Sequence, residues 1–106
     1  YIEDYIDGML LAMEKLEKYQ PINIASGNGV TIRDVLKEIL IATDYLDVQV
    51  TFDTSKPTMI PKRMIDISLA NNLLSWYPKI SLHDGITKTV SWYEETYFEK
   101  SPEEVI

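Results

Sequence analysis

Residues 21–34 read PINIASGNGVTIRD, and this stretch decides the predicted fold. The apolar run at 22–25 is typical of a short buried strand, and the small polar residues at 26–29 predict a turn. Thr31 and Asp34 have the spacing of a capping box, in which each side chain binds a free backbone amide at a helix start. This helix is expected to continue to about residue 41. The stretch therefore predicts a strand, a turn and a helix in that order.

Three more helices are predicted around this stretch. Residues 4–18 carry apolar side chains at helical spacing, with Asp4 as the expected N-cap. A short helix is expected at 68–74, and a last one follows a second capping box, Ser81 with Asp84. The first helix carries an apolar stripe of Ile6, Met9, Leu10, Met13 and Leu16, and the last carries one of Ile86, Val90, Tyr93 and Tyr97. The second helix is expected to bury the face formed by Ile32, Val35, Leu36, Ile39 and Leu40.

A second strand is predicted at 48–53, where apolar and polar residues alternate with the period of a half-buried strand. The order α-β-α-β-α-α predicts a small, mostly helical α/β domain with a short, two-stranded parallel sheet. Two strands do not form a stable sheet alone, so helices must cover them or another domain must complete them. The domain is expected to span residues 1–100, with 101–106 as a frayed tail.

Composition restricts the kind of partner. The chain has 106 residues, which suits one domain, and 10 basic against 17 acidic residues give a net charge of −7. This charge argues against binding nucleic acid or an anionic membrane. No apolar run approaches the roughly 20 residues of a membrane span, and no signal peptide is evident. The sequence has no cysteine, so disulfide and cysteine-ligated metal sites are excluded. A cytoplasmic protein, cut from a longer chain, is expected.

Most candidate chemistry has a plain structural explanation. Gly27-x-Gly29 resembles the start of a dinucleotide-binding loop, but the third glycine is replaced by Ile32, so a simple turn is favoured. His83 is the only histidine and is expected on the surface, without a metal. The aromatic residues Trp76, Trp92 and Tyr93 suit a sugar-stacking platform, but burial between helices is the favoured interpretation. No cofactor-binding, metal-binding or catalytic residue is therefore predicted.

The segment 54–65 differs from the rest of the chain. It contains Lys56, Lys62 and Arg63, and no acidic residue lies between Asp53 and Asp66. Two prolines reduce the entropy that this loop loses on becoming ordered. An arginine can bind a phosphate through two parallel hydrogen bonds, and lysines add point charges. The segment suits an anion clamp, and the alternative is a solvated loop whose charges meet surface acids.

A family resemblance rests on short motifs in register along residues 1–97. The motifs are Tyr1–Asp4, Asn23–Gly27, Val30–Arg33, Asp53–Pro57, Pro61–Asp66, Trp76–Pro78, Ser81–Gly85 and Thr89–Tyr93. In this order they resemble the C-terminal part of the extended short-chain dehydrogenases/reductases. Within these, the chain is similar to the NAD-dependent nucleotide-sugar epimerases and dehydratases, closest to the GDP-fucose synthase-like branch.

The resemblance implies a two-part enzyme. An N-terminal Rossmann domain would hold NAD or NADP and the catalytic Tyr-x-x-x-Lys pair, and neither this pair nor a complete glycine motif occurs here. The chain would be the domain that binds the nucleoside diphosphate sugar, inactive by itself, in an epimerase, dehydratase or reductase. Its expected partners are the sugar nucleotide and its own Rossmann domain.

The substrate-binding residues implied by the resemblance are Arg63, Lys62, Lys56 and Thr58. The first three match basic positions of the family, whereas Thr58 stands where an acidic residue commonly follows Lys-Pro. Ser75 stands where relatives have glycine before the aromatic residue, so it is strained if that position needs a positive φ.

The alternative is a stand-alone interaction or dimerisation module without enzymatic activity. The apolar stripes of the first and last helices would then dock a partner protein. Some self-association of the chain is expected in either case, because exposed apolar patches associate.

Overall fold

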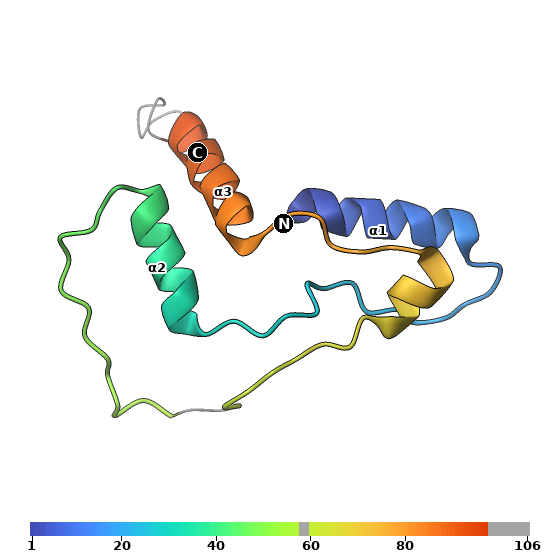
Figure 1. Ribbon diagram of the computed structural model, residues 1–106, viewed down its shortest axis with the longest axis horizontal. Helices are drawn as coiled ribbons and strands as arrows, with labels where there is room; N and C mark the ends of the chain where they lie inside the picture. Colours follow the sequence, from blue (N-terminus) through green and yellow to red (C-terminus); the bar gives the residue numbers. More distant parts are fainter. Residues whose placement is uncertain (58–59, 98–106) are drawn as a thin grey trace. The chain divides into compact units, whose positions relative to one another are not determined.

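The computed structural model describes residues 1–57 and 60–97. Its elements are the α-helices α1 (Ile2–Lys15), α2 (Ile32–Ala42) and α3 (Leu82–Tyr97) and the short π-helix η1 (Ala70–Leu74) (Figure 1). They belong to two compact units: the first contains residues 1–30 and 51–80, and the second contains residues 31–50 and the chain from residue 81. No helix among the described residues is both long and apolar enough to cross a membrane.

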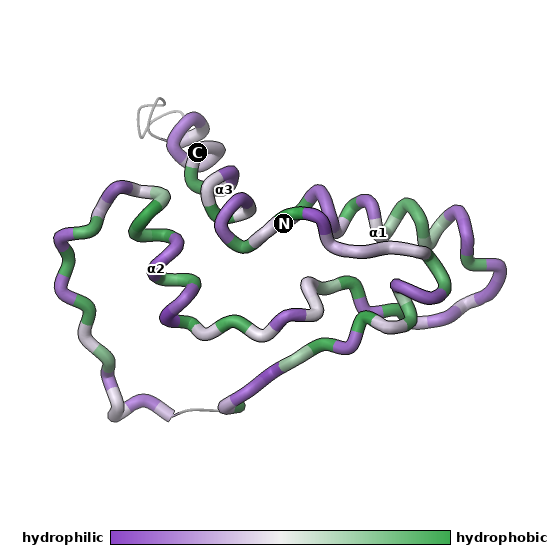
Figure 2. Tube along the Cα trace, in the orientation of Figure 1, coloured by the Kyte–Doolittle hydropathy of each residue, from purple (hydrophilic) through white to green (hydrophobic). Residues whose placement is uncertain are grey.

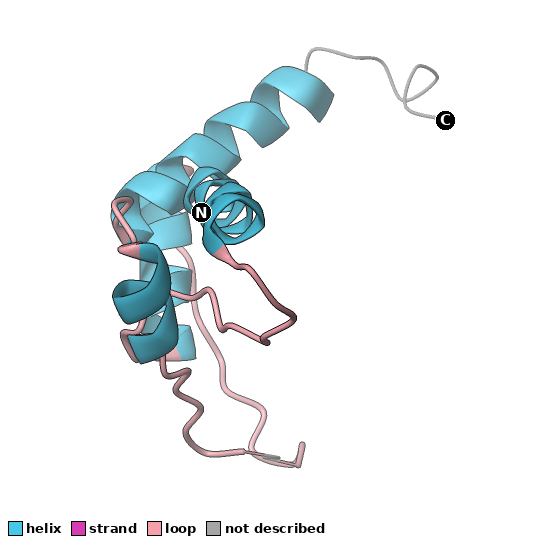
Figure 3. Cartoon of the chain, turned by 90° about the vertical axis from the view of Figure 1, so that its right-hand side faces the viewer, coloured by secondary structure: helices cyan, strands magenta, loops and turns pink. Residues whose placement is uncertain are grey.

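The predicted sheet is wrong, because the described residues contain helices and loops only (Figure 3). The segment at 22–25 packs its apolar side chains against helices without forming a strand. Ile22 and Ile24 pack against the helical core of the first unit, and Asn23 reaches the backbone oxygen of Asp66 through its side-chain amide, at 3.2 Å. The segment at 48–53 is also irregular. The α/β fold class with a two-stranded sheet is therefore replaced by an all-helical one.

The core of the first unit is small. Among its described residues, only Ala70, Leu74 and Trp76 are buried apolar residues, and partly buried side chains from α1 and from 22–24 surround them. The helix predicted at 68–74 is present, and its last five residues form the wider η1. The Lys15 ammonium donates to the backbone oxygen of Leu74 at 2.8 Å, which satisfies a carbonyl at the end of η1.

Asp4 has a different role from the predicted one. Helix α1 begins at Ile2, so Asp4 lies inside its first turn and is not the N-cap, and the helix ends at Lys15 instead of residue 18. The Asp4 side chain is 6% exposed, and its Oδ2 accepts hydrogen bonds from the backbone amides of Lys79 and Ile80, at 3.0 and 2.9 Å. Its backbone oxygen accepts one from the indole of Trp76, at 3.0 Å. Asp4 therefore attaches the 76–80 segment to α1.

The face of α1 that packs inward is not the predicted one. Asp4 and Gly8 are buried, and a Cβ added at Gly8 would lie 2.9 Å from Cδ1 of Ile24, so glycine permits this close approach. Of the apolar stripe predicted for this helix, Leu16 packs against the core, whereas Ile6, Met9, Leu10 and Met13 are exposed, Met13 at 80%. Figure 2 shows these apolar positions recurring along the helix. We call this surface the outer face of α1; it consists of Ile2, Tyr5, Ile6, Met9, Leu10 and Met13.

The second unit packs α2 against α3. The capping box of Thr31 and Asp34 is confirmed in full. At α3, the Ser81 hydroxyl oxygen accepts the Asp84 amide at 3.1 Å and donates to its carboxylate at 2.6 Å. Of the apolar face predicted for α2, Val35, Leu36 and Leu40 are half-buried, whereas Ile32 and Ile39 are exposed. Ile86 and Val90 of α3 are half-buried. The tail predicted at 101–106 lies outside the described residues.

Candidate functional site

The basic segment lies in the first unit, between residue 51 and η1, and has no regular secondary structure in its described part. Its start is ordered by Asp53, whose Oδ1 accepts the Ser55 hydroxyl at 2.6 Å and the Ser55 amide at 3.0 Å. These bonds hold the pKa of Asp53 below its usual value. The Lys56 ammonium lies 4.0 Å from Asp53 Oδ2, and both side chains are largely exposed. Lys56 therefore keeps most of its contact with water.

Lys62 and Arg63 are both exposed. Within the described part of the chain, neither makes a hydrogen bond or an ion pair, so neither charge is neutralised at short range. The alternative of a loop whose charges meet surface acids therefore applies to Lys56 but not to this pair. Thr58, the fourth predicted position, lies outside the described residues.

An open pocket of about 390 Å³ begins immediately after Arg63 in the sequence. Its lining residues are Gly27, Met64, Ile65, Asp66, Ile67, Ser68 and Asn71. Gly27 has φ of 72°, and a Cβ at this position would lie 2.8 Å from Cδ1 of Ile67. The interpretation of Gly27 as a turn glycine is consistent with this left-handed backbone. The glycine allows the 26–29 turn to lie against Ile67.

Two polar groups of this pocket were not predicted as site residues. Asp66 Oδ1 accepts the Ser68 amide at 2.8 Å, a bond that lowers the pKa of Asp66 and keeps its carboxylate charged. Asn71 Oδ1 is buried and has no hydrogen-bond partner among the described residues. An unsatisfied buried carbonyl oxygen is costly to the fold. Sequence reasoning had no signal for Asn71, because its burial depends on the π-helical turn.

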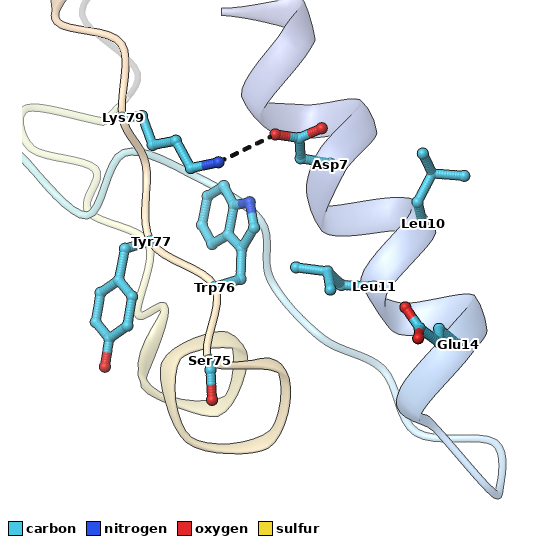
Figure 4. A pocket seen from close by; sticks show the side chains of 8 residues that line it. All are labelled: Asp7, Leu10, Leu11, Glu14, Ser75, Trp76, Tyr77 and Lys79. Atoms are coloured by element: carbon cyan, nitrogen blue, oxygen red, sulfur yellow. Dashed lines mark hydrogen bonds and ion pairs between the residues drawn. The ribbon is translucent and has the colours of Figure 1, made fainter.

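A second pocket, of about 340 Å³, lies between α1 and the 75–79 segment (Figure 4). Asp7 and Glu14 from α1 give it a negative edge, and the Lys79 ammonium lies 3.4 Å from Asp7 Oδ2. Trp76 faces Leu11 in this pocket. Trp76 is only 3% exposed, and its indole donates a hydrogen bond to the backbone oxygen of Asp4, so Trp76 is a core residue, as predicted. The charges of this pocket do not suit a phosphate, so it is not the candidate site.

The other two aromatic candidates are not buried between helices, contrary to prediction. Trp92 and Tyr93 on α3 are 53% and 50% exposed. Each contacts the ring of Tyr97: Tyr93 stacks on it at a centroid distance of 4.8 Å, and Trp92 meets it edge-on at 5.8 Å. Tyr97, which belongs to the apolar stripe predicted for the last helix, is also exposed, at 39%.

His83 is exposed, as predicted. Its Nδ1 lies 2.7 Å from Oε2 of Glu38, which links α3 to α2. The hydrogen bond to Glu38 and the charge of that carboxylate raise the pKa of His83, and Asp84 adds to the effect. No cluster of three potential metal ligands occurs in the described ranges. The surroundings of His83 are those of a surface ion pair.

Comparison with known proteins gives a consistent set of relatives. The chain is 36% identical over 84 residues to GDP-L-fucose synthase of Escherichia coli, covering 76% of this chain and 26% of that protein. It is 31% identical over 93 residues to GDP-L-fucose synthase 1 of Arabidopsis thaliana, covering 88% of this chain and 28% of that protein. It is 33% identical over 107 residues to UDP-glucuronate 4-epimerase of Thermodesulfobacterium geofontis, covering 90% of this chain and 29% of that protein.

The chain belongs to the family of GDP-L-fucose synthases and related nucleotide-sugar epimerases and decarboxylases. The family resemblance drawn from the sequence motifs is thereby confirmed. The chain spans less than a third of the length of the curated relatives it matches. No family model matches it, and no solved structure matches it.

Proposed function

We propose that this chain binds the nucleoside diphosphate sugar in an NAD(P)-dependent enzyme of this family, and that Arg63, Lys62 and Lys56 contact the diphosphate. Thr58 completes the proposed substrate-binding set. The cofactor and the catalytic Tyr-x-x-x-Lys pair belong to a Rossmann domain of the same enzyme. The chain itself contributes binding and orientation of the sugar, and no catalytic group.

The names of the relatives support a diphosphate as the recognised group. They name GDP-L-fucose, UDP-glucuronate (in two relatives) and a UDP-linked glucosaminuronate. The bases and the sugars differ, and the diphosphate is the part that these compounds share. A site kept in common by such enzymes therefore has to recognise phosphate oxygens, and exposed basic side chains are suited to that task.

The charge distribution is the observation that carries the proposal. The described part of the basic segment bears three positive charges in a chain whose net charge is −7. Lys62 and Arg63 are exposed and make no bond to a described residue. An anionic substrate would be repelled by most of this protein and attracted to this segment. The adjacent pocket gives a bound nucleotide space immediately beside the basic pair.

The test is substitution of Arg63 in the intact enzyme that carries this chain. We expect Arg63→Ala to raise KM for the sugar nucleotide about tenfold or more, because a charge-assisted hydrogen bond contributes about 1.5–3 kcal/mol. Arg63→Lys keeps the charge but loses the paired hydrogen bonds, so an intermediate KM is expected. The affinity for NAD(P) should not change.

Lys18→Ala is the matched control, since it removes an exposed positive charge of the same unit outside the segment. It should leave KM unchanged. If Arg63→Ala has the KM of the parent enzyme, or if it weakens NAD(P) as much as the sugar nucleotide, the proposed role is wrong.

A further inference from the structure

Methionine is the sulfur-containing residue of this chain. The sequence has four methionines and no cysteine, so thioethers are its readily oxidised sulfur groups. Met9, Met13 and Met64 lie in the described part of the chain, and all three are exposed, Met64 at 56%. Met9 and Met13 lie on the outer face of α1, whereas Met64 follows the basic pair Lys62 and Arg63 directly. Met64 is therefore an oxidisable side chain immediately beside the proposed substrate-binding residues.

Met64 also lines the pocket of about 390 Å³ that begins after Arg63. Its thioether lies close to the 26–29 turn, because a Cβ built on Gly29 would be 3.8 Å from both Cγ and Sδ of Met64. The same side chain thus packs near a backbone turn and borders the pocket. A pocket that admits a sugar nucleotide also admits a small oxidant, so Met64 can be reached whenever the substrate is absent.

We propose that Met64 is a redox-sensitive modification site, and that its oxidation to methionine sulfoxide weakens binding of the nucleoside diphosphate sugar. The oxidant is a peroxide. With hydrogen peroxide, one oxygen atom forms a bond to Sδ, the sulfur gives up two electrons, the O–O bond breaks, and the other oxygen leaves as water. Methionine sulfoxide reductases reverse this with a dithiol, which becomes a disulfide while the oxygen leaves as water. The inference rests on the proposed function of the basic segment.

The sulfoxide changes the pocket wall in two ways. A thioether is apolar and adapts to irregular gaps, whereas a sulfoxide is polar and packs less well near the turn at Gly29. The sulfoxide oxygen is also a hydrogen-bond acceptor without a proton to donate, as are ionised phosphate oxygens. It therefore competes with the diphosphate for the donors of Lys62 and Arg63. Asp66 already gives this pocket a negative charge, so a further acceptor disfavours an anion there.

The first experiment is peroxide treatment of the intact enzyme that carries this chain, followed by dithiothreitol, which reduces disulfides and leaves sulfoxides in place. Peptide mass spectrometry gives the oxidised fraction of each methionine. We expect the dissociation constant for UDP or GDP, whichever the enzyme binds, to rise about fivefold, the equivalent of one neutral hydrogen bond. Methionine sulfoxide reductases should restore it. An unchanged dissociation constant at full oxidation of Met64 would overturn the proposal.

Substitutions assign the effect to one sulfur atom. Met64→Leu keeps an apolar side chain of similar volume, so it should bind the nucleotide like the parent enzyme and lose the sensitivity to peroxide. Met64→Gln places a carbonyl oxygen at this position and should weaken binding without any oxidant. Met13→Leu is the matched control, since Met13 is exposed but lies on α1; it should keep the sensitivity. A Met64→Leu enzyme that is still weakened by peroxide would contradict the assignment.

Protection by the ligand separates this inference from the proposed function. Bound nucleotide should slow the oxidation of Met64 and leave that of Met13 unchanged. If Arg63→Ala weakens the nucleotide but oxidation of Met64 does not, the inference on Met64 is wrong and the proposed function stands. If Arg63→Ala has no effect and the nucleotide gives Met64 no protection, the proposed function is wrong and the inference fails with it.

Discussion

Ser75 has a left-handed backbone, with φ of 54° and ψ of 33°, immediately after η1. Its amide donates to the backbone oxygen of Asn71, at 3.1 Å, so the conformation is fixed by the end of the helix. A residue with a Cβ pays about 1–2 kcal/mol for this conformation, which glycine adopts freely. The left-handed backbone of Ser75 therefore stores strain next to the buried Trp76.

Ser75→Gly should raise the free energy of unfolding by about 1 kcal/mol, since the gain at φ exceeds the extra entropy of glycine in the unfolded chain. Urea denaturation followed by circular dichroism measures the change. Ser75→Ala is the control and should give no gain, because alanine keeps the Cβ. Equal stability of the glycine and alanine variants would show that Ser75 is not strained.

Asp4 and Asp7 both lie on α1 and both contact Lys79, so their substitutions can be compared directly for their effect on the free energy of unfolding. Asp4 is buried and binds the backbone amides of Lys79 and Ile80, whereas Asp7 is half-exposed and pairs with the Lys79 ammonium. Asp4→Ala should lower the free energy of unfolding by about 2–3 kcal/mol, since two amides lose a charged acceptor. Asp7→Ala should cost less than about 1 kcal/mol. Equal losses in urea denaturation would contradict this assignment.

For single residues, the sequence predicted the role correctly where that role depends on neighbouring positions in the chain. Strain at Ser75 was expected from the family resemblance if this position needed a positive φ, and the structure has that positive φ. The role of Asp4 was predicted wrongly, because an acidic residue near a helix start suits both a cap and a first-turn position. Its true partners lie 75 and 76 positions along the chain, where no local pattern points. Asn71 was missed because its burial depends on the π-helical turn, which no sequence pattern predicts.

Among the elements, the helices were predictable and the strands were not. The capping box of Thr31 and Asp34 defines a helix start within four residues, and the structure has it. A short apolar run such as 22–25 predicts only that its side chains are buried. Packing against a helix can bury them as well as a sheet does. The inner face of α1 was also missed, since Gly8 packs closely against Ile24 although glycine carries no hydrophobic signal.

The pair of His83 and Glu38 should make the second unit pH-dependent. The pKa of His83 is raised in the folded chain, so the protonated form is favoured by folding. This contribution to stability is complete below the unfolded pKa of about 6.5 and is lost as the pH rises through the higher folded value. Urea midpoints measured at pH 5.5 and 8.5 should therefore differ.

Glu38→Gln removes the charge that causes this shift. The difference in urea midpoint between the two pH values should be smaller in this variant than in the parent chain. Water screens the exposed pair, so its contribution to the free energy of unfolding is expected to be small. Its change with pH is opposite in sign to the change that the carboxylates cause. The pKa values of Asp34, Asp53 and Asp66 are lowered, and their contributions are lost only in acid. An unchanged pH difference would exclude a contribution from His83.

The whole molecule exposes far more apolar surface than its small core suggests. Large hydrophobic residues are exposed on all three α-helices and along the basic segment. A chain with three buried apolar residues in its described part has little core of its own. The chain also matches less than a third of each of these relatives. The exposed apolar surface and this partial match together favour the interpretation of the chain as part of an enzyme over that of a stand-alone interaction module.

The size of the native gene product tests this view. The 93 residues matched in one relative are 28% of that protein. A native product of roughly three hundred residues is therefore predicted. An antibody against this chain, followed by intact-mass measurement in the source cells, gives the answer. A product no longer than this chain would favour the interaction module instead, and the family match would then reflect ancestry.

The most direct test of the central claim is calorimetric titration of the intact enzyme with a nucleoside diphosphate and with the corresponding nucleoside. The proposal predicts that Arg63→Ala weakens the diphosphate about tenfold or more and leaves the nucleoside unchanged, because the side chain binds phosphate oxygens. GDP with guanosine and UDP with uridine are the pairs to use. Equal affinity of parent and variant for the diphosphate would show that the basic segment does not bind the substrate.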